Sequence, residues 1–348
     1  MNARKSSGGG KGFQFVGVRQ VAAAAGVSTG TVSNVLNRPE TVSEQTRLRV
    51  QGAIDALGFV PSIAAGQLRG HRSKQIGVVV PDVGNPYWAS VLRGVESIIE
   101  AEGLSMLVSS THQDRKRQRS ILRAHRSQGV DGLIHVPISE SAMEWQEFER
   151  CTYGIVTIKP AEQGTDRAAV GSDDVTGARL AMEHLLELGH RSICFINGPH
   201  FVPWCANRLE GVRRAIEARG LRPSKVLKEI SVADLTVAGG KIAAKRILAE
   251  GEATAVLCAN DVTALGVILA CDEARVTIPQ DLSVVGYDDV DFAPALRPSL
   301  TTVHQPSFEI GVAAACRLLG RAYEVDATML APKLVARDST GVPTSIRD

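Results

Sequence analysis

Hydrophobic positions near the amino-terminal end of the chain recur with the spacing of short amphipathic helices. The stretch 21–37, VAAAAGVSTGTVSNVLN, contains two such patterns separated by Gly26, a residue type that permits a sharp turn. The second pattern begins at Ser28, a good N-cap residue. Its apolar positions have i, i+3, i+4 spacing, and they are Val32, Val35 and Leu36. A third helical pattern covers 43–58, so the spacing predicts three short helices.

The exposed face of the second helix consists of small, neutral residues that can form hydrogen bonds. They are Thr29, Gly30, Thr31, Ser33 and Asn34. A helix–turn–helix motif requires such a second helix, because this helix enters the major groove and reaches base edges and phosphates. An ordinary αα-hairpin with a polar outer face has the same pattern, so the stretch alone leaves both interpretations open.

From residue 75 onward, apolar runs of strand length alternate with helical patterns. The first series predicts strands at 76–82, 104–110, 129–137 and 153–159, with helices at 86–102, 114–128 and 141–150. The second series predicts helices at 175–189, 208–219, 239–249 and 264–274, with strands at 193–199, 228–234, 254–260 and 282–289. A final helix at 308–320 and a strand at 333–337 fit either series. Buried parallel strands form nearly continuous apolar runs, so the pattern predicts two tandem α/β lobes with doubly wound parallel sheets and a ligand cleft between them.

These patterns divide the chain into five parts. We expect a disordered Ser/Gly/Lys-rich tail at 1–15, an all-α domain at 16–61, a short helix with a basic linker at 62–74, the two lobes at 75–340, and a tail at 341–348.

Charge is distributed unevenly between these parts. Residues 1–74 contain ten Lys and Arg but only three acids, a net charge of +7, which leaves −5 for the remainder because the whole chain has +2. A basic domain joined to an acidic body is expected when one end binds the phosphates of a nucleic acid. A basic disordered tail would explain only the first three cations, Arg4, Lys5 and Lys11.

The six cysteines are widely scattered and form no CxxC pair, which suggests reduced thiols and a cytoplasmic location. The first residues lack the apolar segment of a signal peptide, and no apolar run approaches the length of a membrane span.

Polar and aromatic residues follow the ends of several predicted strands. The set is Asp82, Asn85, Tyr87, Trp88, Lys159, Asn260, Asp261, Asp288 and Asp289, and Arg208 begins a helix that follows a strand. Carboxylates and amides bind vicinal hydroxyls, and aromatic faces stack on sugars or bases, so this set suits a hydroxylated small molecule. An aspartate after a strand is also often a helix N-cap, and Asp82 and Asp261 fit that alternative best. The chain contains no HExxH or GxGxxG motif and no GxSxG nucleophile elbow at the end of a predicted strand, so the sequence predicts neither a catalytic site nor a cofactor.

Taken together, these motifs resemble the lactose/galactose-repressor (LacI/GalR) family of bacterial transcription regulators. The resemblance covers about residues 17–340 and includes the stretches IGVVVPDVGNPYWASVLRGVE, HLLELGHRSICFINGP, ANDVTALGV and IPQDLSVVGYDDVDFAPALRPSLTTVHQP. It implies a helix–turn–helix headpiece, a hinge helix and a periplasmic-binding-protein-like effector domain. It also implies a homodimer, or a dimer of dimers, on double-stranded operator DNA.

The resemblance assigns roles to individual residues. Thr29, Gly30 and Asn34 correspond to base-reading positions, and Gly30 offers no side chain for that purpose. Ser28, Thr31 and Ser33 would contact phosphates or support those contacts. Leu68 corresponds to the minor-groove wedge of the hinge helix.

In the effector site the family pattern corresponds to Tyr87, Trp88, Trp204, Arg208, Asn260 and Asp288, to which the strand-end pattern adds Asn85. Ser172 and Asp173 stand in place of the commoner Asp-Asn pair, and Asp173 is the expected contact. Lys159 stands where many sugar-responsive members have Arg, and together with Arg208 it would tolerate an anionic effector.

The sequence therefore predicts a ligand-controlled DNA-binding repressor whose effector is a sugar, a sugar acid or a phosphosugar. A sugar-binding transport protein of the periplasmic type would share the two-lobed cleft, but it would have a signal peptide and no basic headpiece. An α/β enzyme is disfavoured because the chain has no catalytic set.

Overall fold

The computed structural model describes residues 16–60, 66, 72–138, 152–158, 169–322 and 329–344. The chain divides into two compact units, Met1–Ser73 and Lys74–Asp348, a boundary one residue before the predicted start of the lobes at 75. The predicted tail at 1–15, the helix at 141–150 and all of the hinge helix except Gly66 lie outside the described residues.

The first unit is a bundle of short helices. It comprises α1 (Val18–Ala25), α2 (Thr29–Asn37), the 3-10 turn η1 (Pro39–Thr41) and α3 (Glu44–Leu57). Val21, Val32 and Val50 are fully buried where the three helices meet. The three predicted helices are therefore present, and α1 is capped although no Ser or Thr precedes it, because Gln20 Oε1 accepts a hydrogen bond from the Gly17 N–H at 2.6 Å.

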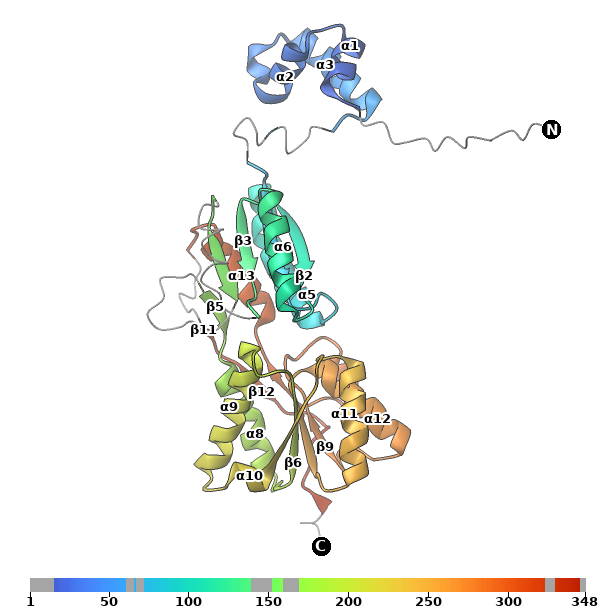
Figure 1. Ribbon diagram of the computed structural model, residues 1–348, viewed down its shortest axis with the longest axis vertical. Coiled ribbons are helices and arrows are strands. Elements are labelled where there is room, and N and C mark those ends of the chain that lie inside the picture. Colours follow the sequence, from blue (N-terminus) through green and yellow to red (C-terminus); the bar gives the residue numbers. More distant parts are fainter. Residues whose placement is uncertain are drawn as a thin grey trace, which may run out of the picture. The chain divides into compact units, whose positions relative to one another are not determined.

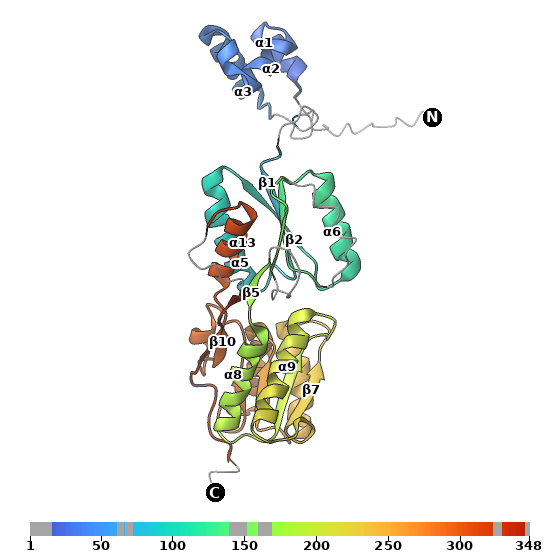
Figure 2. The ribbon, with the colours of Figure 1, turned by 90° about the vertical axis from the view of Figure 1, so that its left-hand side faces the viewer.

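The first lobe of the second unit contains a six-stranded parallel sheet with the order β11-β5-β4-β3-β1-β2. The strands are β1 (Gln75–Val80), β2 (Ser105–Ser110), β3 (Gly132–His135), β4 (Ile155–Ile158), β5 (Ala169–Ser172) and β11 (Met329–Leu330). The helices are α5 (Pro86–Ile99) with the turn η2 (Glu100–Glu102), α6 (Arg115–Ser127) and α13 (Ser307–Leu318). Helices α5 and α13 cover one face of the sheet and α6 covers the other (Figure 2), so this lobe is doubly wound, as predicted.

The second lobe contains a four-stranded parallel sheet with the order β7-β6-β8-β9. The strands are β6 (Ile193–Asn197), β7 (Leu227–Ser231), β8 (Ala255–Cys258) and β9 (Ser283–Val285). The helices are α8 (Asp174–Glu187), α9 (Pro203–Ala218), α10 (Pro223–Val226), α11 (Val237–Glu250) and α12 (Asp261–Ala274), followed by the turn η3 (Ala293–Ala295). Figure 1 shows α8 and α9 on one face of the sheet and α11 and α12 on the other. A small antiparallel pair, β10 (Thr302–His304) with β12 (Lys333–Val335), lies beside this lobe.

Several elements differ from the sequence prediction. Strands β5, β10 and β11 were not predicted, because each has only two to four residues and, unlike the equally short β9, none lies in an apolar run of strand length. Helix α9 begins at Pro203, five residues before the predicted start at Arg208, since proline is favoured in the first turn of a helix. The late helix α13 packs in the first lobe, whereas β12 pairs with β10.

The chain passes between the lobes three times within its described part. These crossovers join β5 to α8, β10 to α13, and β11 to β12. Each crossover is short, so the two lobes face each other along the ends of their strands (Figure 2).

Glycines allow the backbones of two helix pairs, α5 with α13 and α11 with α12, to contact each other directly. A Cβ atom on Gly94 of α5 would lie 2.1 Å from the carbonyl oxygen of Phe308, and one on Gly311 of α13 would lie 2.0 Å from that of Val91. Helices α11 and α12 cross in the same way at Gly240. Side chains at these positions would separate the helices, so the glycines fix the layers that support the strand ends.

Two buried histidines lie between α6 and the first sheet. His125 Nε2 is 2.8 Å from Ser109 Oγ, and His135 on β3 is fully buried. Burial lowers the pKa of His135 to about 3, with a smaller contribution from His125, and burial also lowers the pKa of His125. The folded chain therefore keeps both rings neutral at a pH where an unfolded chain would protonate them.

We expect the second unit to lose stability as the pH falls below about 6.5, the ordinary pKa of histidine. Between that pH and about 3, only the unfolded state binds a proton at His135, so this residue alone should cost roughly 1.4 kcal/mol per pH unit. Urea denaturation at pH 7, 6 and 5 measures the slope, and His135→Gln should reduce it by about one proton. An equal slope in the variant would contradict the prediction.

Candidate functional site

A cavity of about 310 Å³ lies between the lobes at the carboxyl ends of their strands. The first lobe contributes Pro81, Asp82, Asn85, Tyr87, Trp88, His112, Gln113, Val136, Pro137, Ile158, Gly171 and Ser172. The second lobe and its crossover contribute Asp174, Pro203, Trp204, Arg208, Asp234, Leu235, Thr236, Asn260, Asp288 and Gln305. This is the position at which doubly wound sheets bind ligands.

A buried arginine lies at the centre of the second-lobe wall. Arg208 Nε donates a hydrogen bond to Asp174 Oδ1 at 2.9 Å, and its Nη2 lies 3.9 Å from Asp288 Oδ1. The guanidinium carbon is 3.8 Å from the centroid of the Tyr287 ring, and Nη1 donates to the carbonyl oxygen of Ala259. The Arg208 side chain is 8% exposed, so its charge is balanced mainly by these protein carboxyl groups and not by solvent.

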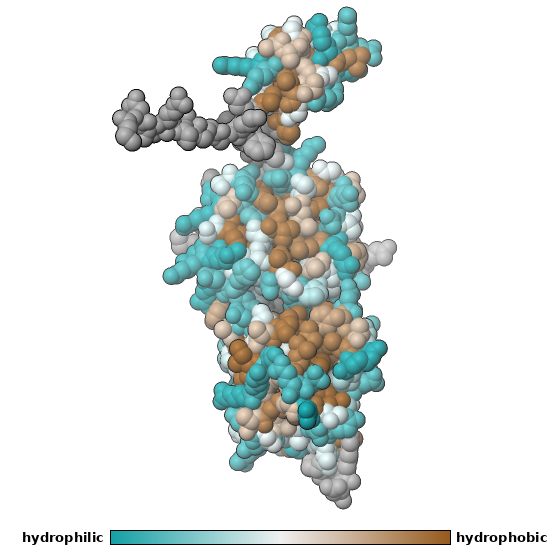
Figure 3. All heavy atoms as spheres, turned by 90° about the vertical axis from the view of Figure 1, so that its right-hand side faces the viewer, coloured by the Kyte–Doolittle hydropathy of each residue, from teal (hydrophilic) through white to brown (hydrophobic). Residues whose placement is uncertain are grey.

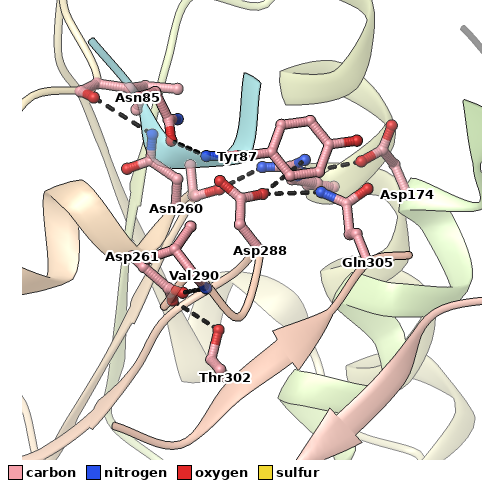
Figure 4. Close-up of polar contacts among 12 residues, drawn as sticks. Asn85, Tyr87, Asp174, Asn260, Asp261, Asp288, Val290, Thr302 and Gln305 are labelled. Carbon is pink, nitrogen blue, oxygen red and sulfur yellow. Dashed lines mark hydrogen bonds and ion pairs between the residues drawn. The ribbon is translucent and has the colours of Figure 1, made fainter. Parts of the chain in front are cut away.

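The carboxyl group of Asp288 is close to titration at neutral pH. Burial raises its pKa to about 7, against the opposing effect of Arg208. Burial also raises the pKa of Asp174. Gln305 Nε2 donates to Asp288 Oδ1 at 2.8 Å, and Figure 4 shows both side chains beside Asp174 and below the Tyr87 ring. The second-lobe wall thus contains a buried cluster of two carboxyl groups, Asp174 and Asp288, and one guanidinium.

Asp288 also has an unusual backbone. Its φ is 111°, and that of Asp289 is 56°. A non-glycine residue in such a conformation costs about 1–3 kcal/mol and persists only when its surroundings enforce it. The strain therefore marks this turn as one that the fold holds in place.

Asp261 lies behind the cavity and has a structural role. It is fully buried, and it accepts hydrogen bonds from Thr302 Oγ1 at 2.6 Å and from the Val290 N–H at 2.9 Å (Figure 4). Burial raises its pKa well above the ordinary value. The alternative role of Asp82 and Asp261 as N-caps does not hold: Asp82 accepts from the Gly84 N–H within its own turn, and Asn260, not Asp261, is the N-cap of α12.

Two of the predicted effector residues, Asn85 and Asn260, are the N-caps of α5 and α12. Asn85 Oδ1 accepts from the Tyr87 N–H at 3.0 Å, and Asn260 Oδ1 accepts from the Thr263 N–H at 2.8 Å. Asn260 Nδ2 also donates to the Leu235 carbonyl at 3.3 Å. Both amides are buried and line the cavity, so capping fixes the orientation of groups that a ligand would meet.

Three aromatic side chains meet across the cleft. Tyr87 and Trp88 lie on the first lobe with ring centroids 4.7 Å apart, and Trp88 lies 6.5 Å from Trp204 of the second lobe. Both pairs are edge-to-face, which leaves ring faces available for a flat or C–H-rich ligand.

Asp174 rather than Asp173 lines the cavity, which corrects the sequence expectation. Asp173 is the N-cap of α8, and it accepts from the Thr176 N–H at 2.9 Å and from Thr176 Oγ1 at 2.6 Å. The first helical turn directs the next residue, Asp174, toward Arg208. Lys159 lies outside the described residues.

Sequence reasoning missed Gln305 as a lining residue, and it noted Ser172 only as a departure from the family pattern and not as a contact. Gln305 follows β10, a three-residue strand that has no recognisable pattern, and Ser172 ends the equally short β5. The run TTVHQP was noted as a family stretch, but nothing in it indicates that its glutamine reaches a carboxylate.

The second candidate surface is the outer face of α2 in the first unit. Ser28, Thr29, Gly30 and Asn34 are exposed, and Thr31 and Ser33 are half-buried. Ser28 Oγ accepts from the Thr31 N–H at 3.0 Å and so caps the helix. Leu68, the predicted wedge, lies outside the described residues.

Among the described residues, no helix is long and apolar enough to cross a membrane. The same residues contain no cluster of three or more His, Cys, Asp or Glu side chains that would suit a metal ion.

Comparison with known proteins gives matches over both units. Residues 18–62 match the family model described as bacterial regulatory proteins, lacI family, and residues 182–340 match a periplasmic binding protein-like domain. The chain is 32% identical to the HTH-type transcriptional regulator DegA of Bacillus subtilis, over 93% of this chain and 97% of DegA. It is also 32% identical to the ribose operon repressor of Escherichia coli, over 87% and 92% of the two chains. The solved structure of the lac repressor dimer bound to operator and the anti-inducer ONPF is similar with a TM-score of 0.74 at 29% identity, over 94% of this chain and 100% of that chain.

We expect Arg208→Met to destabilise the second unit by roughly 3–5 kcal/mol, because it leaves Asp174 and Asp288 buried without a countercharge. Urea denaturation at pH 7.5 measures the loss. The matched control is Arg219→Met, which breaks an ion pair with Glu187 whose side chains are 42% and 63% exposed and should cost less than about 1 kcal/mol. Similar losses in the two variants would show that the buried network contributes no more than a surface pair.

Proposed function

The chain belongs to the LacI family of bacterial transcriptional regulators, and we propose that its effector is an uncharged, polyhydroxylated molecule, a neutral sugar, bound in the cavity between the lobes. Members of this family bind DNA through the helix–turn–helix headpiece under the control of a small-molecule ligand. The proposal concerns the chemical class of that ligand, the residues that bind it and the residues that read the DNA.

The charge of the cavity wall is the observation on which the proposal rests. Arg208 is the only lysine or arginine among the described lining residues, and its charge is already paired with Asp174 and Asp288. Four acids line the same cavity, namely Asp82, Asp174, Asp234 and Asp288. A carboxylate or phosphate on the ligand would lose its hydration and meet like charges. The cavity therefore favours a neutral sugar over the sugar acid or phosphosugar that Lys159 had suggested.

The remaining lining groups suit a sugar. The buried amides Asn85 and Asn260 and the carboxyl of Asp288 present fixed donors and acceptors for hydroxyls. Trp88 and Trp204 supply ring faces on opposite walls, on which the C–H face of a sugar ring can stack.

Of the predicted contacts, Asp173 is replaced by Asp174 in this proposal, and Lys159 stays a prediction. Binding without chemistry is the expected role, so we propose no enzymatic activity.

Control of DNA binding follows from the position of the cavity. A ligand that contacts Trp88 on one lobe and Arg208 or Asp288 on the other stabilises the arrangement in which these groups lie at their present spacing. Effector binding changes the operator affinity only if this arrangement of the lobes binds DNA more tightly or more weakly than the arrangement without the effector. The free energies of effector binding and of DNA binding are then coupled.

We further propose that α2 reads the operator. The exposed side chains of Thr29 and Asn34 reach base edges, since Asn pairs with adenine and the Thr methyl group contacts thymine. The hydroxyls of Ser28, Thr31 and Ser33 would contact or support contacts to phosphates, and Gly30 leaves a gap. Leu68 in the 62–74 linker stays the predicted wedge.

A second copy of the chain is the proposed partner in solution. Ile242 on α11 is 71% exposed and Leu269 on the adjacent α12 is 42% exposed, and Figure 3 shows apolar surface over this side of the second lobe. Burying such residues favours association, and a two-fold dimer matches a palindromic operator. The assembly would act in the cytoplasm, where the DNA is.

A thermal-shift screen tests the effector class. We expect at least one neutral sugar, from D-ribose, D-galactose, D-fructose and cellobiose, to raise the unfolding midpoint of the second unit by several degrees, because ligand binding to the folded state stabilises it by mass action. D-Ribose 5-phosphate, D-galacturonate and D-gluconate serve as anionic counterparts and should give no shift. A larger shift with an anion than with every neutral sugar would overturn the proposal.

Operator binding tests the reading helix. Asn34→Ala should weaken binding to an operator selected from random-sequence DNA by about 1–3 kcal/mol, while binding to a scrambled duplex should stay the same. Fluorescence anisotropy at one fixed salt concentration measures both affinities, because phosphate contacts depend strongly on salt. An equal loss on both duplexes would remove Asn34 from base reading.

A further inference from the structure

The turn at Asp288 and Asp289 is held by contacts outside the cavity. Both residues have positive φ, at 111° and 56°, a backbone conformation that non-glycine residues adopt at a cost. Asp288 lines the cavity, whereas Asp289 is not among its lining residues. Whatever fixes Asp289 therefore fixes the neighbouring carboxyl that the ligand would meet.

Two side chains from different segments hold the Asp289 carboxylate. Arg337 Nη2 donates to Asp289 Oδ1 at 2.6 Å, and His304 Nδ1 lies 3.1 Å from Oδ2. Asp289 and Arg337 are 15% and 18% exposed, so solvent screens this pair less than a surface pair. Arg337 Nη1 also donates to the Leu300 carbonyl at 2.7 Å. The carboxylate thus joins the turn to the end of β10 and to the segment that follows β12.

The same turn lies along the crossover that leads into the first lobe. The Asp288 N–H donates to the Val303 carbonyl at 2.9 Å, and Gln305 donates to the Asp288 side chain. Two residues after Gln305 the chain enters α13, which packs in the first lobe. A shift of the turn would therefore move the hydrogen-bond partners of the crossover.

We propose that Asp289 is a positioning residue that holds Asp288 in the cavity and couples this carboxyl to the crossover between the lobes. The proposal rests on the proposed function, since it assumes that the cavity binds the effector. Aspartate suits the position for two reasons: it tolerates left-handed backbone better than most residues, and its two oxygens serve two partners on different segments. Asparagine retains the backbone preference and one acceptor oxygen, whereas alanine retains neither.

Hydrogen–deuterium exchange of the full chain without any ligand tests the coupling. In Asp289→Ala we expect amides in both 286–290 and 302–306 to exchange at least about tenfold faster than in the unmodified chain, because the turn and the crossover lose their common anchor. Asp289→Asn should restore most of the protection. The matched control is Asp338→Ala, which removes an exposed hydrogen bond from Ser299 in the same region and should leave both segments unchanged.

Effector affinity provides the second readout. D-Ribose, D-galactose, D-fructose and cellobiose are titrated by calorimetry against the same variants. Any sugar that binds the unmodified chain should bind Asp289→Ala about tenfold more weakly, a coupling typical of interacting neighbours, and should bind Asp289→Asn and Asp338→Ala nearly as well as the unmodified chain. Failure of all four sugars to bind the unmodified chain would contradict the proposed effector class, and the exchange experiment would still decide the role of Asp289.

Two outcomes would overturn the inference. The first is faster exchange confined to 286–290, which would show that the turn and the crossover are independent. The second is a lower unfolding midpoint in Asp289→Ala with unchanged sugar affinity, which would assign Asp289 a structural role only.

Discussion

The buried guanidinium of Arg208 is the interaction on which the second unit depends most. It satisfies Asp174 at the start of α8, the carbonyl of Ala259 after β8, and Asp288 after β9, while it stacks on Tyr287. Burying these charges without a partner would cost several kcal/mol for each ion, so the segments that supply them must meet in one arrangement. The shape of the second-lobe wall is therefore set by charge neutralisation as much as by apolar packing.

This neutralisation also determines what the cavity can bind. Because the charge of Arg208 is balanced by Asp174 and Asp288 within the protein, the described wall offers a ligand more carboxyl groups than cations, together with amides and aromatic faces. The pKa of Asp288, raised to about 7 by burial, means that this group can present either a protonated or an ionised oxygen near neutral pH. A hydroxyl can donate or accept and so matches both states, whereas an anion matches only the protonated one. The proposed preference for a neutral polyol rests on this asymmetry.

The apolar pattern was enough to predict the helices of the first unit and most long elements of both lobes, because burial of one face leaves a period in the sequence. It could not predict β5, β10 or β11, which are short and lie in no apolar run of strand length. Polar residues after predicted strands were enough to predict which segments line the cleft. They could not distinguish Asp173 from Asp174, because both are aspartates and only the geometry of the first turn of α8 decides which one reaches Arg208. The hydrogen bond from Gln305 to Asp288 depends on how the chain crosses between the lobes, and no pattern in the neighbouring sequence predicts that crossover.

Helix capping and ligand binding are not alternative roles in this fold. In a parallel sheet each strand ends where the next helix begins, so the N-cap residue lies at the edge of the sheet that forms the cleft. Asn85 and Asn260 use their oxygen for the cap, and the cap prevents the amide from rotating. A preorganised amide loses less entropy on binding a ligand than a free one. The preference for asparagine at these strand ends therefore has one physical origin, and the strained turn at Asp288, which no helix cap orients, requires the separate anchor that Asp289 supplies.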